Sequence, residues 1–139
     1  MSFSGAKLLL CSGGEVLTYL RDDKPGLGWA GRWDLPGGGR EGKESPEACV
    51  LRELEEEFGL RLGPERLQWR RAFPAVDAPG KTGWFFAGRI FRDEIAAIRF
   101  GDEGQFWRMM ALGDWLARPD AIPPLQARSR IALGELGWI

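Results

Sequence analysis

Four glutamates crowd the segment RELEEEF at residues 52–58. Like charges three or four residues apart repel each other on a helix, and anions near a helix C-terminus oppose the helix dipole. A divalent cation would offset this cost, because Mg2+ and Mn2+ prefer carboxylate oxygens and water as ligands. Glu53 precedes Glu56 by three residues and Glu57 by four, so these three share a helix face, whereas Glu55 points to solvent. The alternative is a solvated acidic face that binds no metal.

Histidine is absent from the chain. This excludes a histidine general base, Ser-His-Asp and Cys-His nucleophile systems, and His-ligated zinc. Any catalysis must use carboxylates, Lys, Arg, Tyr, Cys or a metal bound by oxygen, so water would be activated by a metal, a carboxylate or both. The two cysteines, Cys11 and Cys49, form no close-spaced pair and are expected to be buried free thiols.

Three glycines, Gly37–Gly39, precede the acidic segment and are predicted to form a loop. Because no Cβ stands in the way, their backbone could approach a phosphate or a metal closely. Arg40 and Lys43 follow, and their cations could meet phosphate oxygens. The alternative is a flexible turn between a strand and a helix, which explains the glycines but not the acids beside them.

The spacing of these residues resembles the Nudix box, the signature of the Nudix hydrolase family. That box is a Gly, any five residues, a Glu, any seven, Arg-Glu, an aliphatic residue, any residue, Glu-Glu, any residue, a Gly and an aliphatic residue. The matching positions here are Gly38, Glu44, Arg52, Glu53, Leu54, Glu56, Glu57, Gly59 and Leu60. The lead-in WDLPGG at residues 33–38 also looks like that of the family. The resemblance covers a small part of the chain but every specified position of the motif.

The resemblance implies a set of metal ligands. Glu53, Glu56 and Glu57 would bind one or more Mg2+ or Mn2+ ions, and the backbone carbonyl of Gly37 or Gly38 would assist. The cofactor expected from the resemblance is therefore Mg2+ or Mn2+.

The resemblance also implies supporting and catalytic roles. Gly38, Glu44 and Arg52 would support the site, with a Glu44–Arg52 pair orienting the helix against the loop. The family often supplies a further acid from a loop after the box, and Glu103 is the candidate for a distal metal ligand or general base. The alternatives are Glu56 as the base and Glu103 as an ordinary loop acid.

The implied activity is metal-assisted attack of water on phosphorus in a phosphoanhydride bond of a nucleoside diphosphate derivative, without a covalent intermediate. A small nucleotide such as a nucleoside triphosphate is favoured, because the chain has no room for an added recognition domain. ADP-ribose, sugar nucleotides and dinucleoside polyphosphates stay open as substrates. The rival hypotheses are a Nudix-like module that binds a nucleotide without cleaving it and a partner-binding protein with an acidic helix.

Aromatic and cationic residues near the glycines are candidates for substrate binding. Trp29 and Trp33 flank the loop that leads to the glycines, and a base could stack on an exposed indole. Arg40 is the candidate for a phosphate contact. Most aromatic residues of a domain this size fill the core, so burial of either tryptophan is the alternative.

The elements that must position these residues follow from hydrophobic patterning and turn signals. Strands are predicted at residues 6–11, 15–21, 33–35, 67–75, 83–91 and 105–109, with hairpins joining the first pair and the pair at 67–91. Helices are predicted at 112–117 and 125–136, and a stronger one begins with Ser45 as N-cap and Pro46 at its first position. Gly59 ends that helix, whose apolar residues Leu54 and Phe58 face the core.

Length and composition limit the architecture and the partners. The chain has 139 residues, 44% of them hydrophobic, and a formal charge of −1. We expect one domain over residues 1–139, of the α+β class: an α/β/α sandwich with a mixed β-sheet and the box helix packed against it, as in the Nudix fold. Charge balance argues against a nucleic-acid polymer or a membrane as partner. A cytoplasmic monomer or homodimer is expected.

Overall fold

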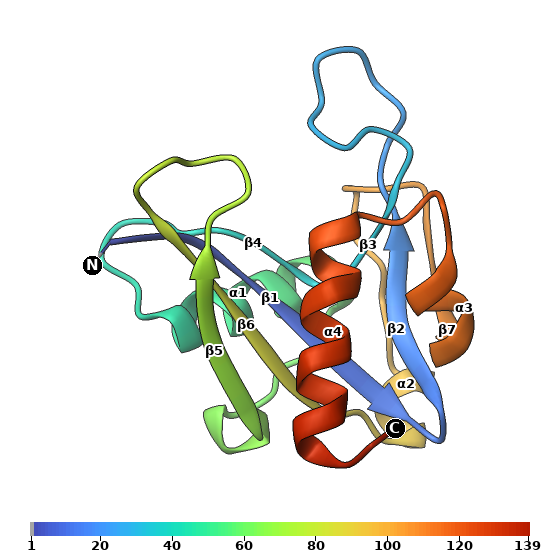
Figure 1. Ribbon diagram of the computed structural model, residues 1–139. Coiled ribbons are helices and arrows are strands. Elements are labelled where there is room, and N and C mark those ends of the chain that lie inside the picture. The colour runs from blue at the N-terminus through green and yellow to red at the C-terminus, as the bar shows by residue number, and fades with distance from the viewer. Residues whose placement is uncertain (1) are drawn as a thin grey trace.

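The computed structural model describes residues 2–139, and Met1 lies outside the described residues. A mixed β-sheet is covered on one face by helix α1 (Pro46–Phe58) and on the other by helix α4 (Pro123–Leu136), as Figure 1 shows. This is the α/β/α sandwich of the α+β class that the sequence predicts. Within the described residues no helix has the length and apolar character needed to cross a membrane.

The chain begins with four strands, and the remaining strands and helices are mixed along the rest of it. The strands are β1 (Phe3–Ser12), β2 (Glu15–Leu20), β3 (Trp33–Asp34), β4 (Gly37–Gly39), β5 (Trp69–Pro74), β6 (Thr82–Arg89) and β7 (Phe106–Ala111). The other helices are the 3-10 turn η1 (Pro64–Arg66), α2 (Arg92–Ala96) and α3 (Leu112–Ala117). Both predicted hairpins are confirmed, and so are the helices predicted at 112–117 and 125–136, although the second of these helices begins at Pro123. Elements α2, η1 and β4 were not predicted.

Strand β1 is the centre of the sheet. Its C-terminal end pairs with β2 and its N-terminal part with β4, both antiparallel, while β6 runs parallel along its other edge. Strand β5 pairs with β6 and β7 with β2, both antiparallel. The prediction that Gly37–Gly39 form a loop is therefore wrong, because these residues form strand β4. Gly37 has a left-handed φ of 131°, and a Cβ there would collide with the backbone of Ala6, so only glycine permits this pairing.

Alternation along β1 divides the core between the two faces of the sheet. Leu8 and Leu10 belong to the cluster beneath α1, where Leu54 and Phe58 are fully buried as predicted. Leu9 belongs to the cluster beneath α3 and α4. The cluster on the first of these faces packs α1 against β1, and α1 also contacts β4, so the acids of α1 have a defined position relative to the glycine strand.

The ends of α1 are set by local interactions. The side chain of Ser45 accepts a hydrogen bond from the Ala48 N–H (3.1 Å), and Pro46 occupies the first helical position. Gly59 adopts a left-handed conformation with φ 68° and donates its N–H to the Glu55 carbonyl (2.9 Å). The predicted bounds of this helix are confirmed.

Candidate metal and substrate site

The acids of α1 face a pocket that a distant loop completes. Glu53, Glu56 and Glu57 line it together with Asp102 and Glu103, which lie just before β7. The structure thus brings all four predicted acids together and adds Asp102, for which no role was predicted. The loop is anchored to α1, because the Gly101 N–H donates to the Glu57 carbonyl (2.9 Å).

Glu57 is the most buried of these acids, with 6% of its surface exposed. Its carboxylate accepts a hydrogen bond from the Gly37 N–H (2.9 Å). Burial raises the pKa of Glu57 to about 8, although the Lys7 ammonium and the Gly37 N–H act in the opposite direction. Burial also raises the pKa of Glu53. Negative charge at these two positions is costly until a cation offsets it.

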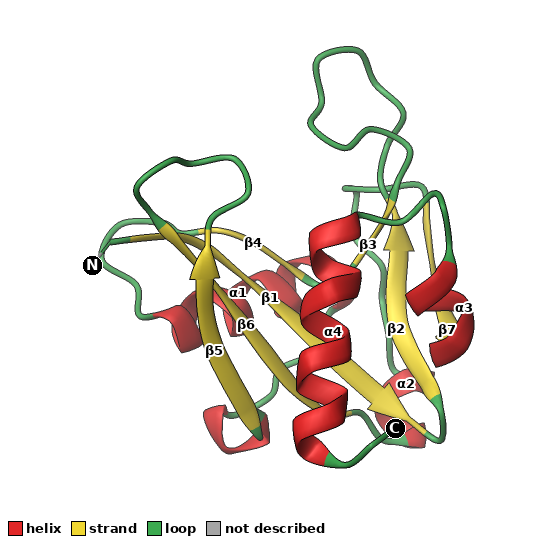
Figure 2. Ribbon diagram, in the orientation of Figure 1, coloured by secondary structure: helices red, strands yellow, loops and turns green. Residues whose placement is uncertain are grey.

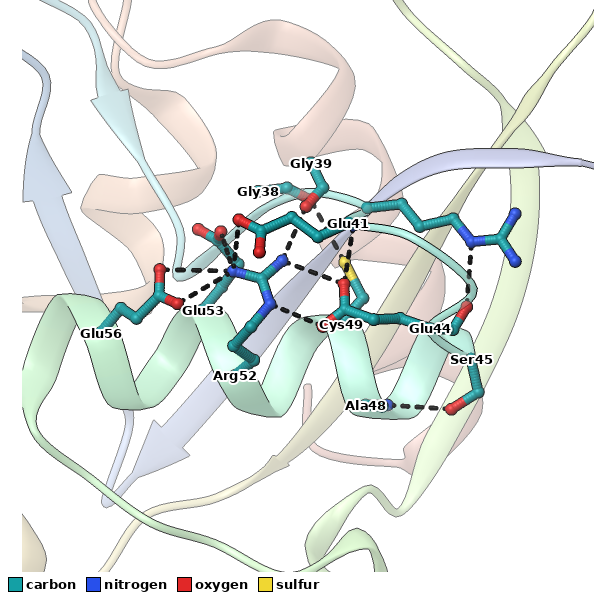
Figure 3. A network of polar contacts seen from close by, with 11 residues as sticks. Gly38, Gly39, Glu41, Glu44, Ser45, Ala48, Cys49, Arg52, Glu53 and Glu56 are labelled. Atoms are coloured by element: carbon teal, nitrogen blue, oxygen red, sulfur yellow. Dashed lines mark hydrogen bonds and ion pairs between the residues drawn. The ribbon is translucent and has the colours of Figure 1, made fainter.

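Arg52 joins the acidic helix to the preceding loop (Figure 3). Its Nε and Nη2 form a two-pronged ion pair with Glu44 (2.6 and 3.0 Å), and Nη2 also donates to the Gly39 carbonyl (2.9 Å). Its Nη1 contacts the carboxylates of Glu53 (2.8 Å) and Glu56 (3.1 Å). The pKa of Glu44 is lowered chiefly by its hydrogen bonds with Arg52. This guanidinium holds loop and helix in register and keeps two pocket acids close together.

The donor set suits a hard divalent cation. Glu41, Glu53 and Glu56 each offer a carboxylate oxygen, and these oxygens lie within 4.8 Å of one another. An all-oxygen set of this charge fits Mg2+ or Mn2+. Gly38 leaves room for the Glu53 carboxylate, because a Cβ at position 38 would overlap it. Glu41 was not predicted as a ligand, because its position depends on how the loop folds over α1.

The two backbone carbonyls predicted as metal ligands, those of Gly37 and Gly38, each accept a hydrogen bond from a side chain. Lys7 Nζ donates to the Gly37 carbonyl (3.1 Å) and to the Leu35 carbonyl (3.2 Å). The carbonyl of Gly38 accepts a weak hydrogen bond from the Cys49 thiol (3.6 Å). A role for either carbonyl in metal binding stays a prediction.

Asp34 is a buried acid for which no role was predicted from the sequence. One of its oxygens accepts hydrogen bonds from Lys7 Nζ, Arg21 Nη1 and Tyr19 Oη, each 3.0 Å long. Its side chain is 1% exposed. The carboxylate therefore ties β1, β2 and β3 together beside the glycine strand. The neighbouring residues do not indicate this role of Asp34, because its hydrogen-bond partners are 13 to 27 residues away in the sequence.

A second, larger cavity of about 460 Å3 includes residues of β1 and β4 in its lining. Gly38 lines this cavity, and a Cβ at Gly38 would overlap the Glu53 carboxylate, so this end of the cavity lies close to one acid of the pocket. The connections β2–β3 and β5–β6 project from the same end of the sheet at which α4 begins (Figure 2). Both connections and the first turns of α4 line the cavity. A volume of this size is typical of small-molecule sites.

The three residues predicted as substrate-binding candidates differ in their surroundings. Trp29 lines the cavity, is 39% exposed and has a left-handed φ of 56°, a conformation that a bulky side chain rarely adopts. Trp33 is 3% exposed and packs edge-on against Phe106, so its burial favours the alternative of a core residue over a stacking residue. Arg40 as a phosphate contact is also not supported, since it covers the Phe3 ring and donates to its own loop.

The fold and the acid-lined pocket define an α/β/α domain of the Nudix type. Residues 4–129 match the model of the NUDIX domain, and the chain belongs to the Nudix hydrolase family.

Curated relatives share part of this chain. It is 47% identical over 95 residues to the RNA pyrophosphohydrolase of Acidiphilium cryptum, a match that covers 66% of the chain and 56% of that protein. The RNA pyrophosphohydrolase of Gluconacetobacter diazotrophicus is 44% identical over 55 residues, which cover 37% of the chain and 33% of that protein. The matched segments thus span between one third and just over half of these relatives.

Solved structures share the fold at low sequence identity. The MutT protein of Methanosarcina mazei Go1 has a TM-score of 0.69 and 22% identity, with 91% of this chain and 89% of that chain covered. The Ap4A hydrolase of C. elegans also has a TM-score of 0.69, with 20% identity and coverage of 97% and 98%. These likenesses establish the fold alone.

Proposed function

We propose that this protein hydrolyses a phosphoanhydride bond in a nucleoside diphosphate derivative with the help of Mg2+ or Mn2+. The observation that carries the proposal is the proximity at Gly38, where a cavity large enough for a nucleoside lies close to Glu53 of the carboxylate-lined pocket. A substrate with its base in the cavity would place its phosphates beside the acids.

Glu53, Glu56 and Glu57 would hold the cation, and Glu41 can add a fourth carboxylate from the loop. When bound, the cation would neutralise phosphate charge and favour ionisation of the attacking water. Arg52 keeps the carboxylates of Glu53 and Glu56 close together before the cation arrives.

The general base is Glu56 or Glu103, since both line the pocket. Either carboxylate would accept a proton from water as the water attacks phosphorus. The loop that carries Glu103 is held at both ends, at Gly101 by α1 and at Gly104 by the side chain of Asp22 (3.3 Å). This anchoring keeps the acid at a defined place across the pocket from α1. Attack of water releases two phosphate-containing products without a covalent intermediate.

The favoured substrate is a small nucleotide such as a nucleoside triphosphate, whose base would stack on the exposed indole of Trp29. ADP-ribose and sugar nucleotides are the alternatives within the same chemistry. The curated relatives support a further candidate, a triphosphorylated RNA end, because both are RNA pyrophosphohydrolases. A nucleotide-binding module without activity is the rival from another class, and its acids would be free to vary, whereas here all of them are present.

The test is metal-dependent release of phosphate or pyrophosphate from a panel of substrates. The panel contains nucleoside triphosphates, ADP-ribose, sugar nucleotides, dinucleoside polyphosphates and a short triphosphorylated RNA. Release should require Mg2+ or Mn2+ and should fall at least 100-fold in Glu56→Gln. Glu55→Gln is the matched control, because Glu55 pairs with Arg61 at the surface (2.8 Å). Binding of one substrate without cleavage of any would support the binding module instead.

A further inference from the structure

The α4 wall of the cavity carries one cation, Arg128, that pairs with no carboxylate of residues 2–139. Its Nη2 donates to the Pro74 carbonyl (2.7 Å), and its guanidinium lies over the ring of Phe73, 4.8 Å from the centroid. These contacts fix the plane of the guanidinium and leave its other N–H groups free to meet a ligand in the cavity.

The strand opposite Arg128 keeps that edge accessible. Gly83 of β6 lies beside it, and a Cβ there would lie 3.7 Å from Arg128 Nη1. Any longer side chain would therefore cover the nitrogen. Arg128 is partly buried, and this burial lowers the pKa of its guanidinium. A partly desolvated donor group gains more from an acceptor in a ligand than an exposed one does.

The location of Arg128 suits a base better than a phosphate. Under the proposed function the phosphates lie at the Gly38 end of the cavity, the end close to Glu53. Arg128 belongs instead to α4, which also contributes the apolar side chain of Leu125 to the lining, and the apolar side chains of Ile122 and Trp84 line the same cavity. A flat, weakly hydrated ring fits such surroundings, whereas a phosphate would lose its hydration there.

The hydrogen-bonding groups of the Arg128 guanidinium and of each purine base then determine which base fits. A guanidinium offers parallel N–H donors and no acceptor. Guanine and hypoxanthine present two neighbouring acceptors, O6 and N7, whereas adenine presents N7 beside an amino group that is itself a donor. We propose that Arg128 is the base-specificity residue of this site and selects 6-oxopurine nucleotides over 6-aminopurine nucleotides. The inference rests on the proposed function for the position of the phosphates.

The experiment compares GTP, ITP, ATP and 7-deaza-GTP as substrates of the full chain with Mg2+. ITP differs from ATP at the edge that Arg128 would contact, and 7-deaza-GTP lacks the N7 acceptor. We expect kcat/KM for GTP and ITP to exceed that for ATP by roughly 10-fold to 100-fold, the range of a two-pronged base contact. The 7-deaza nucleotide should fall below GTP, a result that needs no variant.

Arg128→Met removes the donors and keeps an apolar stem, and it should bring GTP and ATP within about threefold of each other. Arg130→Met is the matched control on the same helix, because Arg130 donates to the Leu116 carbonyl (3.1 Å) at the surface. Its preference should equal that of the wild type. Equal wild-type rates for ITP and ATP would overturn the inference, as would an equal loss of GTP and ATP hydrolysis in Arg128→Met.

Binding of GDP, IDP and ADP separates this inference from the proposed function. If the protein binds GDP and IDP more tightly than ADP but cleaves no nucleotide, the proposed function fails and the role of Arg128 stands. If it cleaves nucleotides without regard to the base, the role of Arg128 fails and the proposed function stands. Failure to bind any of the three overturns the role of Arg128.

Discussion

Glu57→Gln should stabilise the metal-free protein while it abolishes turnover. The carboxyl group of Glu57 is buried, and its pKa rises from 4.5 to about 8 because burial disfavours the charged form. The folded protein therefore binds a proton that the unfolded chain releases above pH 4.5, so wild-type stability falls as pH rises toward 8. Glutamine has no such charge, and its carbonyl can still accept the Gly37 N–H.

The size of the effect follows from the pKa difference. One pKa unit corresponds to about 1.4 kcal/mol, so full ionisation of Glu57 costs at most about 5 kcal/mol, and relaxation around the charge reduces this to about 2–4 kcal/mol. Little of this cost is present near pH 5, and nearly all of it is present at pH 8.5. Other titrating groups contribute equally to both proteins and cancel in the difference.

The assay is urea unfolding in EDTA at intervals from pH 5 to pH 8.5. The free energy of unfolding of Glu57→Gln should approach that of the wild type near pH 5 and exceed it by about 2–4 kcal/mol at pH 8.5. Adding Mg2+ at pH 8.5 should then stabilise the wild type more than the variant. Glu55→Gln serves as control and should follow the wild type. Parallel pH curves for wild type and Glu57→Gln would refute the reasoning, and so would wild-type turnover in the variant.

Other predictions test the neighbouring contacts. Gly38→Ala places a Cβ against the Glu53 carboxylate, so kcat should fall at least 10-fold in a steady-state assay while the circular dichroism spectrum is kept. Asp34→Asn weakens the partner of two cations and should cost about 2–4 kcal/mol in urea unfolding; a loss below 0.5 kcal/mol would contradict a structural role. Glu94→Gln should cost about 1 kcal/mol at pH 7. The pKa of Glu94 is lowered by hydrogen bonds from Arg66, so this difference should disappear as pH falls through that lowered pKa, and its persistence in acid would count against the ion pair.

Much of the site could be predicted from the sequence because its main element is local. The caps of α1, Ser45 and Gly59, act within one turn of the helix, so both ends are readable from neighbouring residues. Spacing along the helix placed Glu53, Glu56 and Glu57 on one face, and the structure gives them one pocket. The hairpins were readable for the same reason, since each joins neighbours in the chain.

Tertiary structure alone decided the properties that depend on distant residues. The glycines became strand β4 because β1 offers an edge for pairing, and no feature of residues 37–39 by themselves shows that edge. Packing against the sheet made Glu57 a buried acid and left Glu56 exposed, a difference invisible in two adjacent glutamates. Packing likewise put Trp33 in the core and Trp29 at the cavity. Burial and pairing are sums over contacts far apart in sequence, so they arise only when the chain folds.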